Sequence, residues 1–186
     1  MTETEFMQLD GHRAEWVNGV THFVPPVTVD HDDLRNLLIR VLGDLTDNST
    51  GGNIHGEPFV AKLFDGSIRS PDVLFISGKN LPKLHRKRFN DGPDLVIEIG
   101  SADYVARDDR EKVAEYRQAG VREYWIIDPL SKTVEVHRRN SRRKFTVVQP
   151  TDGRVYFKVI PKFFFDHRWL RAPLPRKAAV LKLMGL

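Results

Sequence analysis

One stretch, GPDLVIEIGSADY at residues 92–104, contains an apolar run of the kind that forms a buried β-strand. The run nevertheless carries a carboxylate, Glu98, near its end. Burying a charged side chain is costly unless a partner stabilises the charge. A strand at this place therefore needs a partner for Glu98, and we expect that partner to be a metal ion shared with Asp72.

Other segments show the periodicity of helices. Six apolar residues between 34 and 45 recur at the spacing of one helical face, which predicts a helix over 30–48. A second helix is expected at 107–119, because its first turn is acidic and Gly120 can end it in the left-handed conformation.

Strand and turn signals fill the rest of the chain. Asn18-Gly19 lies between two apolar runs and predicts an N-terminal β-hairpin, because Asn-Gly accepts the positive φ angles of a tight turn. A second hairpin is expected around Asn140. Further strands are expected at 54–64, 72–77, 94–99, 122–128 and 154–160, and a short amphipathic helix at 175–186.

This order of elements predicts an α/β fold in which helices flank a mixed central β-sheet, with a β-hairpin at the N-terminus. No internal repeat, low-complexity tract or linker divides the sequence. We therefore expect one domain over residues 1–186, with a core at about 15–160 and a basic C-terminal extension at 161–186.

Charge and cysteine content limit the class of protein. Residues 131–186 carry 14 Lys/Arg and 3 Asp/Glu, whereas residues 1–130 carry 15 and 22. The basic part fits either a polyanionic partner or an ordinary solvated surface. The absence of cysteine excludes disulfides and thiolate metal sites and is consistent with a reducing cytoplasm. We expect no signal peptide and no membrane span, because the N-terminus is polar and no long apolar run occurs.

The acidic residues suggest a site at one edge of the sheet. If the strands at 72–77 and 94–99 are antiparallel neighbours, Asp72 at the start of one lies beside Glu98 at the end of the other. Two adjacent carboxylates repel unless a cation or a proton relieves them, and Mg²⁺ prefers oxygen ligands. Asp94 shares the face of Glu98 but lies about 13 Å along the strand, so it more simply serves a strand-entry turn.

Two further residues have both a functional and an ordinary interpretation. Glu57 is either a third acidic ligand, or a partner of a metal-bound water, or simply an exposed strand residue; the nearby His55 is expected to be structural or exposed. Lys112 lies in the helix after Glu98, where a lysine can orient a water or stabilise a phosphate. From the residues alone, however, a solvated helix lysine is the simpler interpretation of Lys112.

Three segments together, SPDVLFIS, GPDLVIEIGS and REKVAEYRQAGVREYWIIDP, closely resemble the Uma-two family of putative restriction endonucleases, within the PD-(D/E)xK nuclease superfamily. The resemblance runs from about Glu15 to about His137, is densest at 92–129, and includes His31 and the GEPF segment. It implies a restriction-endonuclease-like fold and Mg²⁺-dependent (or Mn²⁺-dependent) hydrolysis of DNA. It departs from the superfamily pattern at Gly100, where the usual lysine is missing.

The resemblance also implies roles for residues. Asp72 and Glu98 match the two acids of the superfamily, and the family's lysine in the following helix maps onto Lys112. The ion would be held by Asp72, Glu98, the Ile99 carbonyl and Glu57, an acidic position upstream of the first motif acid. Ser101 and Tyr116 are expected beside these groups rather than on the ion. Contacts with DNA phosphates are expected from the basic C-terminal part and from a basic loop that contains Lys79, Lys83, Arg86, Lys87 and Arg88. A homodimer is expected because cutting two strands needs two sites.

Three alternatives remain open from the sequence. A catalytically inactive module of the same fold could bind nucleic acid or a protein. A two-carboxylate glycosidase is a different hydrolase, disfavoured by the basic surface. Finally, Glu98 could need no metal if Arg69 or Arg107 paired with it in a buried salt bridge.

Overall fold

A computed structural model describes residues 1–9, 13–47, 51–100, 111–171 and 173–186 of the chain. Ser101 and Arg107 lie outside these ranges, as does the start of the helix expected at 107–119. The remaining part of that helix is present at 111–118, and Gly120 follows it with φ +83°.

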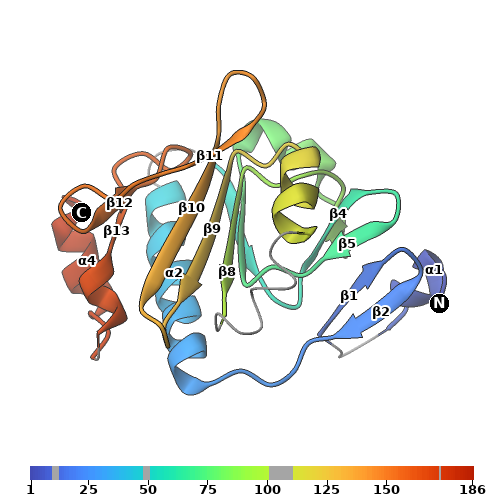
Figure 1. The fold of residues 1–186 in the computed structure, drawn as a ribbon, viewed down its shortest axis with the longest axis horizontal. Helices are drawn as coiled ribbons and strands as arrows, with labels where there is room; N and C mark the ends of the chain where they lie inside the picture. The colour runs from blue at the N-terminus through green and yellow to red at the C-terminus, as the bar shows by residue number, and fades with distance from the viewer. Residues whose placement is uncertain (10–12, 48–50, 101–110, 172) are drawn as a thin grey trace.

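A six-stranded mixed sheet forms the centre of the molecule (Figure 1). Strands β8 and β9 are parallel neighbours, whereas the other neighbouring pairs are antiparallel. The helix at 111–118 lies in the connection between β8 and β9, as a parallel crossover requires. In spatial order the strands are β11 (Phe145–Val147), β10 (Thr133–Arg139), β9 (Glu123–Asp128), β8 (Leu95–Ile99), β6 (Val73–Ile76) and β3 (Asn53–Gly56).

A second, five-stranded sheet contains the N-terminal hairpin. The hairpin turns at Asn18-Gly19 with φ values of +48° and +88°, which confirms the predicted turn. The tip of the hairpin contacts a second turn, because the Asn18 amide donates to the carbonyl of Gly66 at 2.8 Å. The strand order is β2 (Val20–Phe23), β1 (Ala14–Val17), β5 (Ser67–Arg69), β4 (Val60–Phe64) and β7 (Arg88–Phe89).

The two faces of the central sheet bury different cores because side chains alternate along a strand. One face packs on α2 (Val29–Asp47), whose apolar stripe from Leu34 to Leu45 is buried as predicted. The other face packs on the helix at 111–118 and on β4, through residues such as Leu74 and Val96. Asp72 and Glu98 share this second face, since each lies two residues from an apolar member of it.

The C-terminal segment packs against the same core as α2. Helix α4 (Lys177–Leu183) buries Val180, and the Lys177 ammonium contacts Asp44 of α2 at 2.8 Å. Two strands, β12 (Arg154–Tyr156) and β13 (Phe164–Asp166), form a separate small sheet. The short helices of the chain are α1 (Glu3–Phe6), η1 (Gly78–Lys83) and η2 (His167–Leu170).

Two predictions of strand boundaries were wrong. The expected strand at 54–64 is two strands, β3 and β4, which belong to different sheets. Pro58 stands between them, and proline cannot donate to a ladder. The expected strand at 154–160 ends at Tyr156, and β5 was missed although Asp65-Gly66 is a turn signal between β4 and β5.

None of the helices in the described residues is long and apolar enough to cross a membrane.

Candidate functional site

Asp72 and Glu98 face each other at one end of the central sheet. The antiparallel register pairs Val73 of β6 with Ile97 of β8, and one further step sets Asp72 opposite Glu98. This confirms the strand pairing on which the predicted site depends. Asp72 is held in place, because its Oδ2 accepts a 2.7 Å hydrogen bond from the Ile99 amide and its Oδ1 lies 3.0 Å from His31 Nε2.

Glu98 is largely but not fully buried, beside one cation and one hydroxyl. Its Oε1 accepts a 2.8 Å hydrogen bond from the Tyr116 hydroxyl and lies 3.4 Å from the Lys112 ammonium. Its side chain is only 14% exposed. Burial, together with the charges of Glu15 and Asp72, raises the pKa of Glu98 to about 7, although Lys112 and Tyr116 partly oppose the rise. The same surroundings, burial first and then Glu98, raise the pKa of Tyr116.

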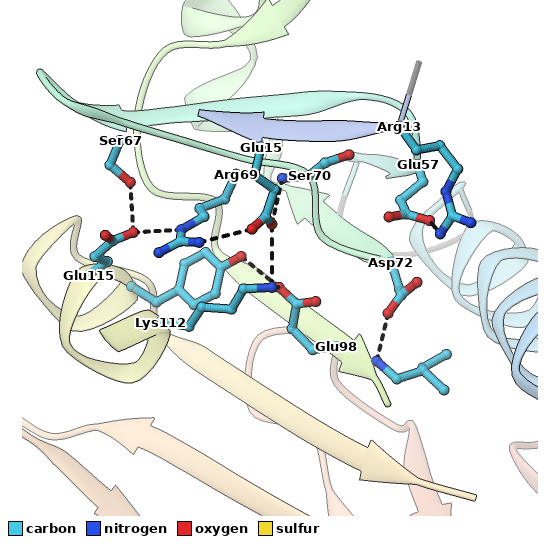
Figure 2. A network of polar contacts seen from close by, with 12 residues as sticks. Arg13, Glu15, Glu57, Ser67, Arg69, Ser70, Asp72, Glu98, Lys112 and Glu115 are labelled. Atoms are coloured by element: carbon cyan, nitrogen blue, oxygen red, sulfur yellow. Dashed lines mark hydrogen bonds and ion pairs between the residues drawn. The ribbon is translucent and has the colours of Figure 1, made fainter. Parts of the chain in front are cut away.

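Lys112 lies between two carboxylates from different sheets (Figure 2). Its ammonium is 3.3 Å from Glu15 Oε1 and 3.4 Å from Glu98 Oε1. The helix at 111–118 lies between the two sheets, so a lysine in its first described turn can reach strands of both. Gly100, where the resemblance places the usual superfamily lysine, follows the strand, and its amide donates to the Ile127 carbonyl.

Glu15 is the residue of this cluster that the sequence analysis missed. It lies in β1, and the register of β1 with β5 sets it opposite Arg69, whose Nη1 is 2.9 Å from Glu15 Oε2. Its Oε1 also accepts a 3.2 Å hydrogen bond from the Ser70 amide. Burial opposes ionisation of Glu15, but the charges of Lys112 and Arg69 outweigh it and hold its pKa below the ordinary value.

Arg69 joins the five-stranded sheet to the helix at 111–118. Besides Glu15, it contacts Glu115 Oε2 through Nε at 2.7 Å, and the Ser67 hydroxyl donates to the same oxygen at 2.7 Å. The sequence suggested Arg69 or Arg107 as an ion-pair partner of Glu98. Arg69 instead contacts two other carboxylates, and Arg107 lies outside the described residues. Among the described residues, the Lys112 ammonium is the cation found beside Glu98.

Glu57 is engaged by arginines rather than facing Glu98. Figure 2 shows its carboxylate turned towards Arg13, and Arg35 Nη1 lies 3.2 Å from Glu57 Oε2. The side chain is only 4% exposed, so the interpretation of Glu57 as an exposed strand residue is wrong. Figure 2 shows this ion-paired group on the same side of the cluster as Asp72.

Asp94 occupies the opposite end of β8. Its Oδ2 accepts hydrogen bonds from the Ser77 amide at 2.9 Å and from Asn80 Nδ2 at 2.8 Å, and Arg122 lies 3.5 Å from its Oδ1. Burial works against its ionisation, yet these donors and the charge of Arg122 hold the pKa of Asp94 below the ordinary value. The interpretation of Asp94 as a strand-entry residue agrees with this geometry.

The basic loop also lies at that opposite end, because β6 runs from Asp72 towards Ile76 and leads directly into η1. Lys79, Lys83, Arg86 and Lys87 are exposed, whereas Arg88 is partly buried against Glu3 at 2.9 Å. Lys83 pairs with Asp91. The loop residues therefore form a surface that is separate from the carboxylate cluster.

The donor set at Asp72 and Glu98 suits a hard divalent ion. Two carboxylates meet there, and Mg²⁺ in proteins is commonly held by one or two carboxylates while water and substrate phosphate complete its shell. Each carboxylate oxygen keeps a further lone pair beyond the hydrogen bonds described. In the part of the chain that the structure describes, no group of three or more His, Cys, Asp or Glu side chains forms a site that could hold a metal ion.

Comparison with known proteins places this geometry in a family. The family model described as "Putative restriction endonuclease", Uma2, matches residues 3–163. A crystal structure of "a putative nuclease belonging to DUF820" from Anabaena variabilis has the same fold, with a TM-score of 0.76 and 20% sequence identity over 91% of this chain and 97% of that chain. No match was found among curated protein sequences. Because the family model covers most of its length, the chain belongs to the Uma2 family of putative restriction endonucleases.

Proposed function

We propose that this protein is a metal-dependent endonuclease that hydrolyses phosphodiester bonds in DNA. The observation that carries the proposal is the meeting of Asp72 and Glu98 across β6 and β8, with the Lys112 ammonium 3.4 Å from Glu98. Two acids and one lysine are the residue types that the PD-(D/E)xK superfamily uses. Membership of a family described as restriction endonucleases supports the nuclease class.

In this proposal Asp72, Glu98 and the Ile99 carbonyl hold Mg²⁺ or Mn²⁺. When bound, such an ion lowers the pKa of a coordinated water and offsets charge on the phosphate. Glu98 must be ionised to act as a ligand. Its raised pKa leaves it only partly ionised near neutral pH, and a bound cation would favour the ionised form. Glu57 contributes negative charge nearby and would have to leave Arg13 and Arg35 to join the ligands.

Lys112 takes the role of the lysine that is absent at Gly100. Its ammonium is held at the Glu98 carboxylate, from which it can orient the attacking water or bind a phosphate oxygen. Tyr116, one turn further along the helix, fixes the same Glu98 oxygen through its hydroxyl. Ser101, next in the chain after Gly100, is proposed to add a hydrogen bond to this group.

DNA is proposed to contact the basic surface through its phosphates. Such contacts give salt-dependent affinity without sequence information. Lys79, Arg86 and Lys87 are exposed and could contact phosphates directly. Lys83 and Arg88 would have to exchange their carboxylate partners for phosphate. We further propose that residues 1–186 act as one domain, that two copies form a homodimer for double-strand cutting, and that the protein works in the cytoplasm.

The direct test is cleavage of supercoiled plasmid in Mg²⁺ and Mn²⁺ by the wild type, Asp72→Asn and Glu98→Gln. We expect divalent-dependent nicking or cutting by the wild type and its loss in both variants. Asp94→Asn, which changes the other end of β8, is the matched control and should remain active. Equal cleavage by all four preparations would show that a contaminant cuts the plasmid.

An inactive module of the same fold is the second candidate, favoured by the missing lysine at Gly100. Calorimetric titration with Mn²⁺ separates the two. The proposal requires binding that Asp72→Asn and Glu98→Gln abolish, whereas an inactive module shows no binding that depends on these residues.

A further inference from the structure

We propose that Glu15, supplied by the N-terminal hairpin, is a positioning residue that holds the Lys112 ammonium against Glu98. The inference rests on the nuclease function proposed above, because Lys112 is given its role there. It adds a residue that lies before both motif acids and belongs to a different sheet.

The geometry gives Lys112 two carboxylate partners rather than one. Glu15 Oε1 and Glu98 Oε1 lie 3.3 and 3.4 Å from the same ammonium, and the Lys112 side chain is 11% exposed. A lysine side chain is flexible, with four rotatable bonds, so a single long contact leaves it several rotamers. Contacts with two carboxylates restrict the ammonium to the position beside both of them that Figure 2 shows.

Glu15 is itself held rigidly enough to serve this purpose. Arg69 binds its Oε2 at 2.9 Å, and the Ser70 amide donates to its Oε1 at 3.2 Å. Arg69 is bound in turn by Glu115, which lies one turn after Lys112 in the same helix. The chain of contacts therefore fixes both the strand that carries Glu15 and the helix that carries Lys112.

The charges around Glu15 argue for positioning and against metal binding. Two cations, Lys112 and Arg69, already contact its carboxylate. A divalent ion at Glu15 would be repelled by both of them. Asp72 differs, because its oxygens contact the Ile99 amide and the His31 imidazole.

A double-mutant cycle on DNA cleavage tests the proposal, using Glu15→Gln, Lys112→Met and the double variant. Glu15→Gln keeps the shape and an acceptor oxygen but loses the charge that attracts the ammonium. We expect kcat to fall about 10–100-fold, as is typical when a residue that orients an active group is changed. If Glu15 acts through Lys112, the double variant is no slower than Lys112→Met alone.

Readouts besides activity separate a positioning role from other roles. In Glu15→Gln, the Kd for Mn²⁺ measured by calorimetry and the KM for DNA should stay within about twofold of wild type. Loss of a metal ligand typically weakens metal binding by far more. Glu123→Gln is the matched control: Glu123 is also buried, with an arginine, Arg138, at 2.7 Å and backbone amides as donors, but lies at the far end of the sheet. Glu123→Gln should lower the Tm by about as much as Glu15→Gln does, but its kcat should equal that of the wild type.

Glu15→Asp, which keeps the charge, provides a second variant if Glu15→Gln fails to fold, and it should cleave faster than Glu15→Gln where both fold. The proposal is overturned if Glu15→Gln cleaves DNA as fast as the wild type, or if the rate losses of the two single variants multiply in the double variant. It is also overturned if Glu15→Gln binds Mn²⁺ more weakly, because Glu15 would then be a metal ligand. A wild-type protein that does not cleave DNA would overturn the nuclease function itself. The two failures are therefore distinguishable.

Discussion

The two ends of strand β8 each carry a buried carboxylate, and the two lie in opposite electrostatic environments. Asp94, at the start, accepts hydrogen bonds from Ser77 and Asn80 and lies near Arg122, so its pKa is lowered despite burial. Glu98, at the end, is buried among other acids, and its pKa is raised to about 7 despite Lys112. The side chains share one face of one strand, only four residues apart.

This difference separates Asp94, whose surroundings are those of a structural carboxylate, from Glu98, the carboxylate for which we propose a function. The folded protein supplies Asp94 with the donors that its charge needs, as a stable turn requires. It leaves Glu98 short of positive charge in a cluster that also holds Glu15 and Asp72, which is a feature typical of active sites. A divalent ion at Glu98 would supply that charge, whereas at Asp94 it would have to displace donors already present.

The largest effect expected from this contrast is on catalysis. Glu98→Gln should lower plasmid cleavage in Mg²⁺ by about 10³-fold or more, because it removes a proposed metal ligand and the partner of Lys112. Asp94→Asn should cleave within about threefold of wild type at a temperature where it is folded, since Asp94 has no part in the chemistry. Equal losses of cleavage activity in the two variants would contradict the distinction between Glu98 and Asp94.

The next largest effect is on stability, at the arginine behind the site. Arg69→Met leaves the buried carboxylates of Glu15 and Glu115 without their shared partner. Breaking a buried ion pair on one side typically costs about 3–5 kcal/mol. Urea unfolding should show a loss of this size, and Lys62→Met, which removes a more exposed pair with Glu3, should show far less. A small loss in Arg69→Met would mean that the Arg69 network contributes little.

The raised pKa of Glu98 predicts a pH dependence with a definite sign. The folded protein disfavours the ionised form of Glu98 and favours the protonated form. Protonated Glu98 therefore contributes fully to the unfolding free energy below the unfolded pKa of 4.5, and this contribution is lost as the pH rises through the folded pKa of about 7. The unfolding free energy of metal-free wild type relative to Glu98→Gln should therefore fall by on the order of 3 kcal/mol between pH 4 and pH 8. A difference that stays constant with pH would contradict the environment described for Glu98.

Asp94 should behave in the opposite sense. Its folded pKa lies below the unfolded value, so its stabilising contribution is present above the unfolded pKa and is lost as the pH falls through the folded pKa. Asp94→Asn should cost about 1–3 kcal/mol at pH 7, as expected when a buried hydrogen-bonded charge is removed. The cost should shrink in acid, and thermal unfolding at pH 7 and pH 3 measures the change. A cost that grows in acid would contradict this assignment.

The smallest effect is expected on the basic loop at the Asp94 end. Lys83 is half exposed and pairs with Asp91, so Lys83→Ala should change the unfolding free energy by less than about 1 kcal/mol. If Lys83 contacts DNA, the variant should reduce the slope of log affinity against log salt by about one. Fluorescence anisotropy with labelled duplex at several salt concentrations gives that slope, and an unchanged slope would remove Lys83 from the proposed DNA surface.

Local signals predicted the central part of the fold well. The turn at Asn18-Gly19 and the buried stripe of α2 follow from short-range patterns, because turn chemistry and periodicity act over a few residues. The pairing of β6 with β8 was only a condition of the predicted site, and the structure confirms it. The split of 54–64 into two sheets depends instead on which partners each half finds elsewhere in the chain. The proline at position 58 marked the break without indicating the partners.

The site was predicted only in part for a related reason. Asp72 and Glu98 lie on strands whose pairing the pattern suggested, but Glu15 reaches them from another sheet. A usable signal was present, because AEWV places a carboxylate within an apolar run just as LVIEI does. What the sequence could not show is that Lys112 lies between Glu15 and Glu98, since that depends on how the two sheets pack.

The most direct test of the central claim is a crystal structure with bound Mn²⁺, located by its anomalous scattering. The account predicts one ion within coordination distance, about 2.0–2.3 Å, of both the Asp72 and the Glu98 carboxylates, with the Lys112 ammonium still between Glu98 and Glu15. The claim would be contradicted by an ion bound elsewhere. It would also be contradicted by a structure at saturating Mn²⁺ that holds no ion and in which the Asp72 carboxylate still contacts His31 and the Ile99 amide.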